Sequence, residues 1–434
     1  MKLKCLGAGH EVGRSGFLLI GSDKILFDYG LKLHPRHLVE KTEKIDFEGN
    51  VEEPIKITEM IDAIVLSHAH LDHSGDIPSL YKKFNPNLFL TQATLDLSTL
   101  LWKDTIKIAK FEKKIASFDL EDIYTTQENA FYLNNRETVE ISKHSKLTFY
   151  DAGHITGSAI SLLEMDDKKI MYTGDFRASE SSMFPGYDKD LPEVDYLIIE
   201  STYGSESHVS RKKLEKELIT EIEKTLKKRG KVILASFAIE RTQEMINLLY
   251  EYKIKAPIYV DGMGVKATDI FLQYPEYFKD FREFKKATKN VNYIVNSKIR
   301  KNLLKDTNPA IIVTTAGMLE GGPVLLYLKE FGDDKNNKLI MSGYQVEGTN
   351  GHRLKTTGKL FIDGDLYQPQ CEIKHISFSG HPDKDELIEF VNLVNPKKVI
   401  CIHGDTSSIE DFQKLLKKEG YESFAPRTGD IIDL

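Results

Sequence analysis

Short apolar runs recur along this chain of 434 residues, and most of them end at a polar or glycine-rich turn. Such runs are typical of buried β-strands. The predicted strands of the first part fall at 3–6, 17–20, 24–28, 64–66, 146–150, 169–173 and 196–199. The stretch 94–130 instead has mostly helical character. Strands that alternate with helices predict an α/β protein.

The middle of the chain carries a second α/β pattern. After Ser210 a basic helical segment begins, and four more strands follow it. They fall at 232–235, 258–260, 310–314 and 339–341. Two later strands, at 372–378 and 398–402, are assigned to the first unit again. We therefore expect a body made of residues 1–207 and 353–434, interrupted by a domain inserted at 208–352.

Three histidines and an aspartate lie within six residues, directly after the apolar run 64–66. Residues two apart in an extended segment point the same way, so His68 and His70 can hold one metal together. Asp72 and His73 follow as the chain turns and could face a second metal. Neutral imidazole and carboxylate suit Zn²⁺, and two such ions can share and activate one water. We predict that these residues bind zinc.

The spacing His-x-His-x-Asp-His resembles the signature of the metallo-β-lactamase superfamily, which implies further ligands downstream. The chain supplies three candidates in the implied order, each at the end of a predicted strand. These candidates are His154, Asp175 and His403. The resemblance implies that His154 completes the first site, that Asp175 bridges the two metals, and that His403 completes the second site.

Other polar residues at strand ends are candidates for catalysis or for support of the ligands. Asp28 closes an apolar strand, where a carboxylate could fix the ligand loop, although a turn-forming aspartate gives the same pattern. Glu200 ends a buried strand and is a candidate for proton handling or ligand support. His381 fits a proton donor steadied by Glu200. Asp72 is the third residue that we assign to catalysis.

The net charge of −7 is unevenly distributed. Residues 208–352 contain 25 Lys and Arg against 18 Asp and Glu, whereas the rest of the chain contains 34 against 48. The basic stretch 281–301 could grip phosphates, with a solvated lysine-rich face as an equal alternative. A helix predicted to open near Gly317 could receive phosphate, or could be a packing turn. The predicted RNA contacts are Arg177, Arg241, Lys298, Arg300 and Gly317.

Composition favours the cytoplasm. No run of 18 apolar residues predicts a membrane span, and residues 1–7 lack the apolar core of a signal peptide. The three cysteines, Cys5, Cys371 and Cys401, lie far apart and form neither a disulfide framework nor a CxxC site. We therefore expect a reducing compartment and no membrane partner.

Motifs along nearly the whole chain resemble the β-CASP group of metallo-β-lactamase-fold nucleases. Besides the ligands, the matching motifs are at 7–15, 200–204, 379–383 and 403–405. Residues 343–349 are similar to the archaeal branch related to the cleavage subunit of the cleavage and polyadenylation specificity factor, and less like the ribonuclease J branch.

This resemblance implies an αββα metallo-β-lactamase sandwich with an inserted α/β β-CASP cap domain and two Zn²⁺ ions. It implies a zinc-dependent ribonuclease, acting on single-stranded RNA as an endonuclease or a 5′-to-3′ exonuclease. A zinc-activated hydroxide would attack the phosphodiester, and His381 with Glu200 would protonate the leaving oxygen. A homodimer and RNA-processing partner proteins are expected on the same ground. The alternatives are a small-ester or thioester hydrolase, which would not need the basic insert, and a DNA nuclease, which His403 argues against. A third alternative is a non-catalytic RNA-processing scaffold, which would be expected to have lost ligands, whereas none is missing here.

Overall fold

The body of the protein contains two β-sheets packed face to face. The structure is a computed structural model that describes residues 1–34 and 51–434. Within these residues each of the two sheets has seven strands. The first has the order β24 (Ile431–Asp433), β1 (Lys2–Gly7), β2 (Gly16–Ile20), β3 (Lys24–Phe27), β6 (Ala63–Val65), β7 (Asn87–Leu90), β8 (Ala130–Tyr132). The second has the order β23 (Glu422–Phe424), β22 (Lys398–Ile402), β13 (Tyr196–Glu200), β12 (Lys168–Tyr172), β11 (Ala159–Met165), β10 (Ser145–Asp151), β9 (Thr138–Glu140).

Alternating side chains of these strands serve two different cores. In β2, Phe17 faces the second sheet, where its ring lies 5.7 Å from that of Tyr172 on β12. The next residue, Leu18, points the other way and packs in the cluster that contains Trp102 of helix α4 (Gln92–Phe111). This period of two is what a strand covered on both faces requires. Each sheet therefore has one face on its partner sheet and one face under helices.

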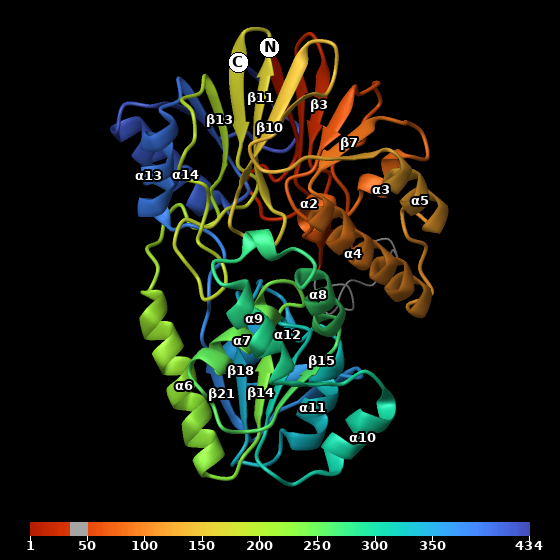
Figure 1. Ribbon diagram of the computed structural model, residues 1–434, viewed down its shortest axis with the longest axis vertical. Helices are drawn as coiled ribbons and strands as arrows, with labels where there is room; N and C mark the ends of the chain where they lie inside the picture. The colour runs from red at the N-terminus through yellow and green to blue at the C-terminus, as the bar shows by residue number, and fades with distance from the viewer. Residues whose placement is uncertain (35–50) are drawn as a thin grey trace.

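Helices cover both outer faces, so the body has the four-layer αββα order that the sequence predicted (Figure 1). The first sheet is covered by α3 (Ile77–Leu80), α4 (Gln92–Phe111) and α5 (Leu120–Glu128). The second is covered by α13 (Lys384–Val394) and α14 (Thr406–Lys418). No helix within the described ranges is long and apolar enough to cross a membrane.

A third sheet of six parallel strands forms the cap below the body in Figure 1. Its order is β16 (Asn292–Tyr293), β15 (Ile258–Asp261), β17 (Ile311–Thr314), β14 (Val232–Ala235), β18 (Lys338–Met341), β21 (Glu372–His375). The surrounding helices are α6 (Arg211–Lys227), α7 (Arg241–Glu251), α8 (Gly264–Phe271), α9 (Phe281–Lys289), α10 (Ser297–Lys305), α11 (Pro323–Phe331) and α12 (Asn350–Thr357). Burial on both faces explains why these strands are continuous apolar runs rather than alternating ones.

The last strand of the cap corrects one expectation about where the chain returns to the body. We assigned the strand at 372–378 to the body, but β21 pairs in parallel with β18, from Lys338 opposite Glu372 to Met341 opposite His375. Phe378 also packs in the core of the cap. The expected boundary at 352/353 therefore comes too early. A parallel neighbour of β18 requires a crossover, and α12 with the hairpin β19 (Leu360–Ile362) and β20 (Asp365–Tyr367) supplies it.

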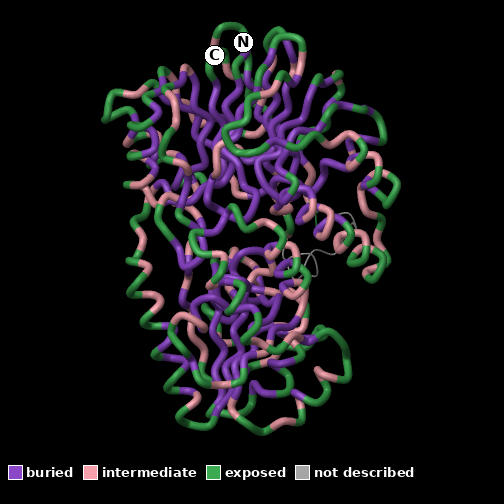
Figure 2. The backbone as a smooth tube through the Cα atoms, in the orientation of Figure 1, coloured by how far each residue is buried: buried purple, intermediate pink, exposed green. Residues whose placement is uncertain are grey.

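Body and cap share one apolar cluster as well as having separate cores. Figure 2 shows that buried segments concentrate in the sheets of both parts. Between them, Leu97 of α4 and Phe184 from the body pack with Phe271 of α8 and with Phe278 of the cap. The ring of Phe184 lies 5.4 Å from that of Phe278. This shared cluster holds the two parts against each other.

Truncation of Phe271 in this cluster should weaken both parts together. Phe271 is fully buried, so Phe271→Ala removes contacts and leaves a cavity, and we expect it to lower the free energy of unfolding by about 3–5 kcal/mol. Chemical denaturation of the whole chain measures the change. Phe111→Ala, at a side chain 86% exposed, is the matched control and should cost little. Equal effects of the two variants would contradict the assignment of Phe271 to the shared core.

Candidate metal centre and active site

The predicted ligands meet because strand ends from both sheets converge. β6 runs into residues 67–70 and the short helix α2 (Leu71–Ser74), which together carry the first four predicted ligands. In the second sheet β12, β13 and β22 are parallel neighbours. Their carboxyl ends lie at one edge, and Asp175, Glu200 and His403 stand at or just beyond these ends. Parallel pairing thus brings residues more than 200 positions apart to one place.

The ligand atoms form two groups that share one carboxylate. In each group, every residue offers one nitrogen or oxygen atom within 4.8 Å of the others. The first group is His68, His70, His154 and Asp175, and the second is Asp72, His73, His403 and Asp175. One oxygen of Asp175 lies 3.5 Å from Nε2 of His68. Its other oxygen lies 3.3 Å from Nε2 of His73 and 3.3 Å from Nδ1 of His403.

These residues fit metal ions. Nε2 of His68 and Oδ1 of Asp175 are buried and have no hydrogen-bond partner, a costly state that a bound cation would relieve. Burial, followed by neighbouring imidazoles, lowers the pKa of His68 and of His154, which keeps their ring lone pairs available. Burial alone would raise the pKa of Asp175, but His403 and His73 hold it well below the usual range. His68 and His154, as neutral imidazoles beside an ionised Asp175, are donors of the kind that zinc binds.

Asp28 connects three parts of the site through one buried carboxylate. It accepts hydrogen bonds from the backbone N–H and the hydroxyl of Ser67, each at 2.7 Å. It also accepts from Nδ1 of His73 at 2.7 Å and from the hydroxyl of Tyr172 at 2.6 Å. The bond to Nδ1 leaves Nε2 of His73 directed at Asp175, so Asp28 fixes both the tautomer and the orientation of this ring. Ser67 and Tyr172 were missed in the sequence, although each lies within three residues of a predicted ligand.

Glu200 and His381 form a second polar pair beside Asp175. Nδ1 of His381 lies 2.9 Å from one oxygen of Glu200 and 3.1 Å from the other. Glu200 is buried and also accepts from the backbone N–H of Phe176 and the hydroxyl of Thr202. Burial disfavours a charged imidazole, but the carboxylates of Glu200 and Asp175 outweigh this effect and raise the pKa of His381 to about 9. The two carboxylates therefore favour the protonated form of His381, with Nε2 available to a substrate.

Two arginines that we predicted to contact RNA are instead buried. Arg177 donates to the carbonyl of Ser379 and to Glu240, which directly precedes α7 of the cap. Arg241, the first residue of α7, forms ion pairs with Glu240 and Glu244. Neither guanidinium is open to solvent. The contacts of Arg177 join the loop that carries His381 to the cap.

Of the other predicted RNA contacts, Arg300 and Gly317 make contacts within the protein, whereas Lys298 is exposed. Arg300 makes a two-pronged ion pair with Asp261, with bonds of 2.6 and 2.7 Å. A side chain at Gly317 would lie 3.0 Å from the backbone nitrogen of Phe237, so this glycine allows a close approach of two loops. The helix expected near Gly317 was wrong, because α11 begins only at Pro323. Lys298 is exposed on α10 and remains a predicted contact.

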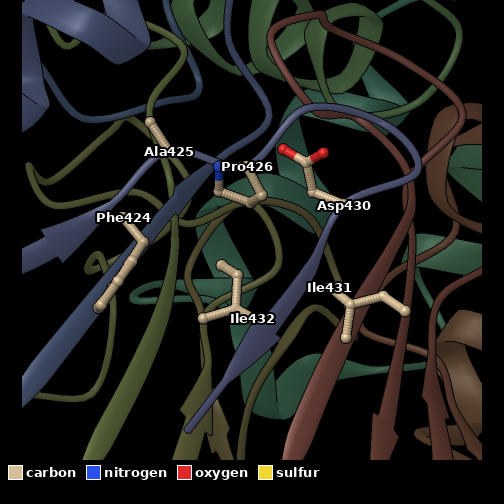
Figure 3. Close-up of a pocket in the computed structure, with 6 residues that line it drawn as sticks. All are labelled: Phe424, Ala425, Pro426, Asp430, Ile431 and Ile432. Carbon is tan, nitrogen blue, oxygen red and sulfur yellow. The ribbon is translucent and has the colours of Figure 1, made fainter.

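A separate surface pocket lies where the chain turns into its last strand. It has a volume of about 240 Å³ and is lined by Phe424, Ala425, Pro426, Asp430, Ile431 and Ile432 (Figure 3). None of the ligand residues contributes to it. The chemistry of this chain is therefore built around the histidine cluster rather than this pocket.

Loss of the Asp28 carboxylate should weaken metal binding. Asp28→Asn keeps the backbone conformation but removes the charged acceptor for His73 Nδ1, and we expect zinc affinity to fall about 10- to 100-fold. Chelator competition measures the affinity. Asp23→Asn is a matched control, because Asp23 is also buried and accepts from Ser142 and Ser145 away from the cluster. Unchanged affinity in Asp28→Asn, or an equal loss in both variants, would contradict this role.

Three models of protein families match the chain. The model described as the metallo-beta-lactamase superfamily matches residues 22–233, and the Beta-Casp domain matches 242–354. A Zn-dependent metallo-hydrolase RNA specificity domain matches 367–426. A crystal structure of a protein of unknown function from Enterococcus faecalis V583 aligns with a TM-score of 0.62 at 16% identity, covering 100% of this chain and 99% of its own, which shows the fold alone.

The chain is also similar over most or all of its length to named proteins. Probable RNase MJ4 of Methanocaldococcus jannaschii is 36% identical, with 100% of both chains covered. An RNase J-like protein of the same organism is 38% identical over 86% of this chain and 89% of its own. Transcription termination factor FttA of Thermococcus kodakarensis is 34% identical over 100% of this chain and 71% of its own. The branch expected from residues 343–349 stays a prediction, but the family is confirmed: this chain belongs to the β-CASP family of the metallo-β-lactamase superfamily.

Proposed function

We propose that this protein is a ribonuclease that hydrolyses phosphodiester bonds of single-stranded RNA with two zinc ions. The observation that carries the proposal is the pair of ligand groups sharing Asp175, next to the hydrogen-bonded pair of His381 and Glu200. The match to an RNA specificity domain and the relatives named as RNases support RNA as the substrate.

Seven side chains would hold the metals. His68, His70 and His154 would hold the first ion, whereas Asp72, His73 and His403 would hold the second, with Asp175 between them. Zinc ions at these positions supply Lewis acidity, which makes water nucleophilic near neutral pH and withdraws charge from a phosphoryl group. The protein keeps the ligands rigid through Asp28 and through the carbonyl of Gly380, to which His154 Nδ1 donates at 2.9 Å.

The site has one open side, and its partly exposed members mark it. His68 and Asp175 are buried, but Asp72 is 30% exposed and His381 is 22% exposed. A phosphodiester entering from this side would meet Asp72 and His381 before any other charged group of the cluster. Asp72 would orient the nucleophile, and His381 Nε2 would give its proton to the leaving 3′ oxygen. The products would be a 3′-hydroxyl and a 5′-phosphate.

The cap supplies the electrostatic support for RNA. The lysines of α9 and α10, including Lys285, Lys286, Lys289, Lys298 and Lys301, are exposed. An exposed basic surface attracts the phosphate backbone. The small-ester hydrolase has no use for this surface and is the weaker alternative. A cytoplasmic location, a homodimer and RNA-processing partner proteins belong to the same proposal; the three buried free cysteines support a reducing compartment.

Incubation of the zinc-loaded protein with RNA tests the proposal. One RNA is labelled at its 5′ end in one sample and internally in another, and the products are separated on a denaturing gel. We expect fragments that disappear in His70→Ala and after chelation, but persist in His144→Ala, where the histidine is exposed and precedes β10, at the opposite end of that strand from His154. Discrete fragments would indicate internal cleavage, and mononucleotides alone would indicate 5′ exonuclease action. No cleavage despite two bound zinc ions would contradict the proposed function.

The Glu200–His381 pair predicts a specific change in the pH profile. The Glu200 carboxylate helps to raise the pKa of His381, so Glu200→Gln should lower that pKa. His381 then loses its proton at a lower pH, so the alkaline limb of the plot of kcat against pH should move to lower pH. His381→Ala, as the control, should keep its zinc, lose about 10²–10⁴-fold in kcat and lose this limb. A limb that stays in place in Glu200→Gln would exclude His381 as the proton donor.

A further inference from the structure

A row of aromatic rings leads from His381 into the cap. Tyr203 follows β13 of the body, and its ring centre lies 6.2 Å from that of His381. On its other side, Tyr203 lies 6.4 Å from Tyr344, with the two rings at 89°. Tyr344 follows β18 of the cap. The row therefore begins at the predicted proton donor and crosses from one part of the molecule to the other.

Tyr344 is exposed, yet the loop that carries it is held in place. Its surface is 47% exposed. Gln345 is buried and donates to the carbonyls of Gly343 and Gly317 at 2.9 and 3.1 Å. His375 donates to the same Gly343 carbonyl at 3.0 Å. An exposed aromatic ring on a braced loop is pre-organised for a ligand, because little side-chain and loop entropy is lost on contact.

Tyr203 is braced in the same way from the body. His208 packs edge-on against it, with ring centres 4.6 Å apart. Nε2 of His208 donates to the carbonyl of His381 at 3.1 Å, and the backbone N–H of His208 donates to Asp383 at 2.9 Å. Tyr203 and the loop of His381 are thus fixed to each other. A group placed on the Tyr203–Tyr344 surface would have a defined position relative to the proton donor.

The charges around Tyr344 favour a neutral group over a backbone phosphate at this position. Burial, followed by the carboxylates of Asp405, Glu206 and Glu347, raises the pKa of Tyr344. The ring is therefore neutral and surrounded by negative charge, which repels phosphate. A nucleobase is neutral, and its π-face stacks on tyrosine without requiring a particular sequence.

We propose that Tyr344, with Tyr203 behind it, forms a stacking subsite for one nucleobase on the 5′ side of the scissile phosphate. The side follows from the position of His381, because the 3′ oxygen that receives its proton belongs to the nucleotide on the 5′ side. This inference rests on the proposed ribonuclease function and adds the position at which the substrate base is held.

The test combines protein variants with RNA that lacks single bases. An oligonucleotide with one mapped cleavage site carries an abasic nucleotide either 5′ or 3′ of the bond. In the unaltered protein, a 5′ abasic nucleotide should lower kcat/KM about tenfold, as loss of one base–aromatic stack does. Tyr344→Ala should lower kcat/KM on intact RNA by a similar factor and should no longer respond to the 5′ abasic nucleotide. Tyr344→Phe, which keeps the ring face, should behave as the unaltered protein.

Two controls separate stacking from a general loss of activity. Tyr124→Ala removes a tyrosine of α5 that is 54% exposed, and should leave every rate unchanged. Cleavage of an oligonucleotide that is abasic on both sides of the bond, and so has no ring to stack there, should be equal in Tyr344→Ala and the unaltered protein. Additive effects of Tyr344→Ala and the 5′ abasic nucleotide, a loss of activity in Tyr344→Phe, or an equal loss on the doubly abasic RNA would each overturn the subsite.

Failure of this subsite can be distinguished from failure of the ribonuclease function. Absence of RNA cleavage by the unaltered protein would contradict the function alone. Binding of the same oligonucleotides, measured by fluorescence anisotropy on chelator-treated protein, then decides the subsite. The subsite is supported if removal of the 5′-side base weakens binding to the unaltered protein but not to Tyr344→Ala. It is overturned if removal of that base leaves the affinity of both proteins unchanged.

Discussion

The buried carboxylate of Asp175 is the constraint on which the rest of the site depends. A charge in a low-dielectric interior needs close partners, and here the partners are imidazoles delivered by loops from both sheets. Asp175, Glu200 and His403 lie together because β12, β13 and β22 pair in parallel in one register. A different register of any of these strands would separate the three side chains. The order of the strands in the second sheet is therefore inseparable from the geometry of the metal centre.

Burial is graded across this centre, and the gradient separates structural from chemical tasks. Asp28, His68 and Asp175 lie in the dry interior, where hydrogen bonds and ion pairs are strong and the ligands have few alternative orientations. Asp72 and His381 are partly exposed, at the side from which we propose that the substrate enters. One continuous cluster thus has a dry, rigid interior and a solvent-accessible rim.

The sequence predicted the body and the seven clustered ligand residues because their signals are local. Each ligand adjoins a short apolar run, and strand ends of this kind recur at a common edge. The pairing of β21 with β18 was not predictable in this way, since the partner of an edge strand depends on contacts distant in sequence. The burial of Arg177 and Arg241 was not predictable for a related reason. An arginine is expected to be exposed unless it has a buried counter-ion, and the sequence alone does not show that Glu240 lies beside both residues.

The Arg177–Glu240 contact has a consequence for how such chains can be recombined. Arg177 comes from the body, and Glu240 directly precedes the first helix after β14 of the cap. A chimera whose cap lacks an acidic residue at the position of Glu240 would leave the buried charge of Arg177 without its counter-ion, a loss of about 3–5 kcal/mol. An exchange of caps therefore has to keep this charge pair intact.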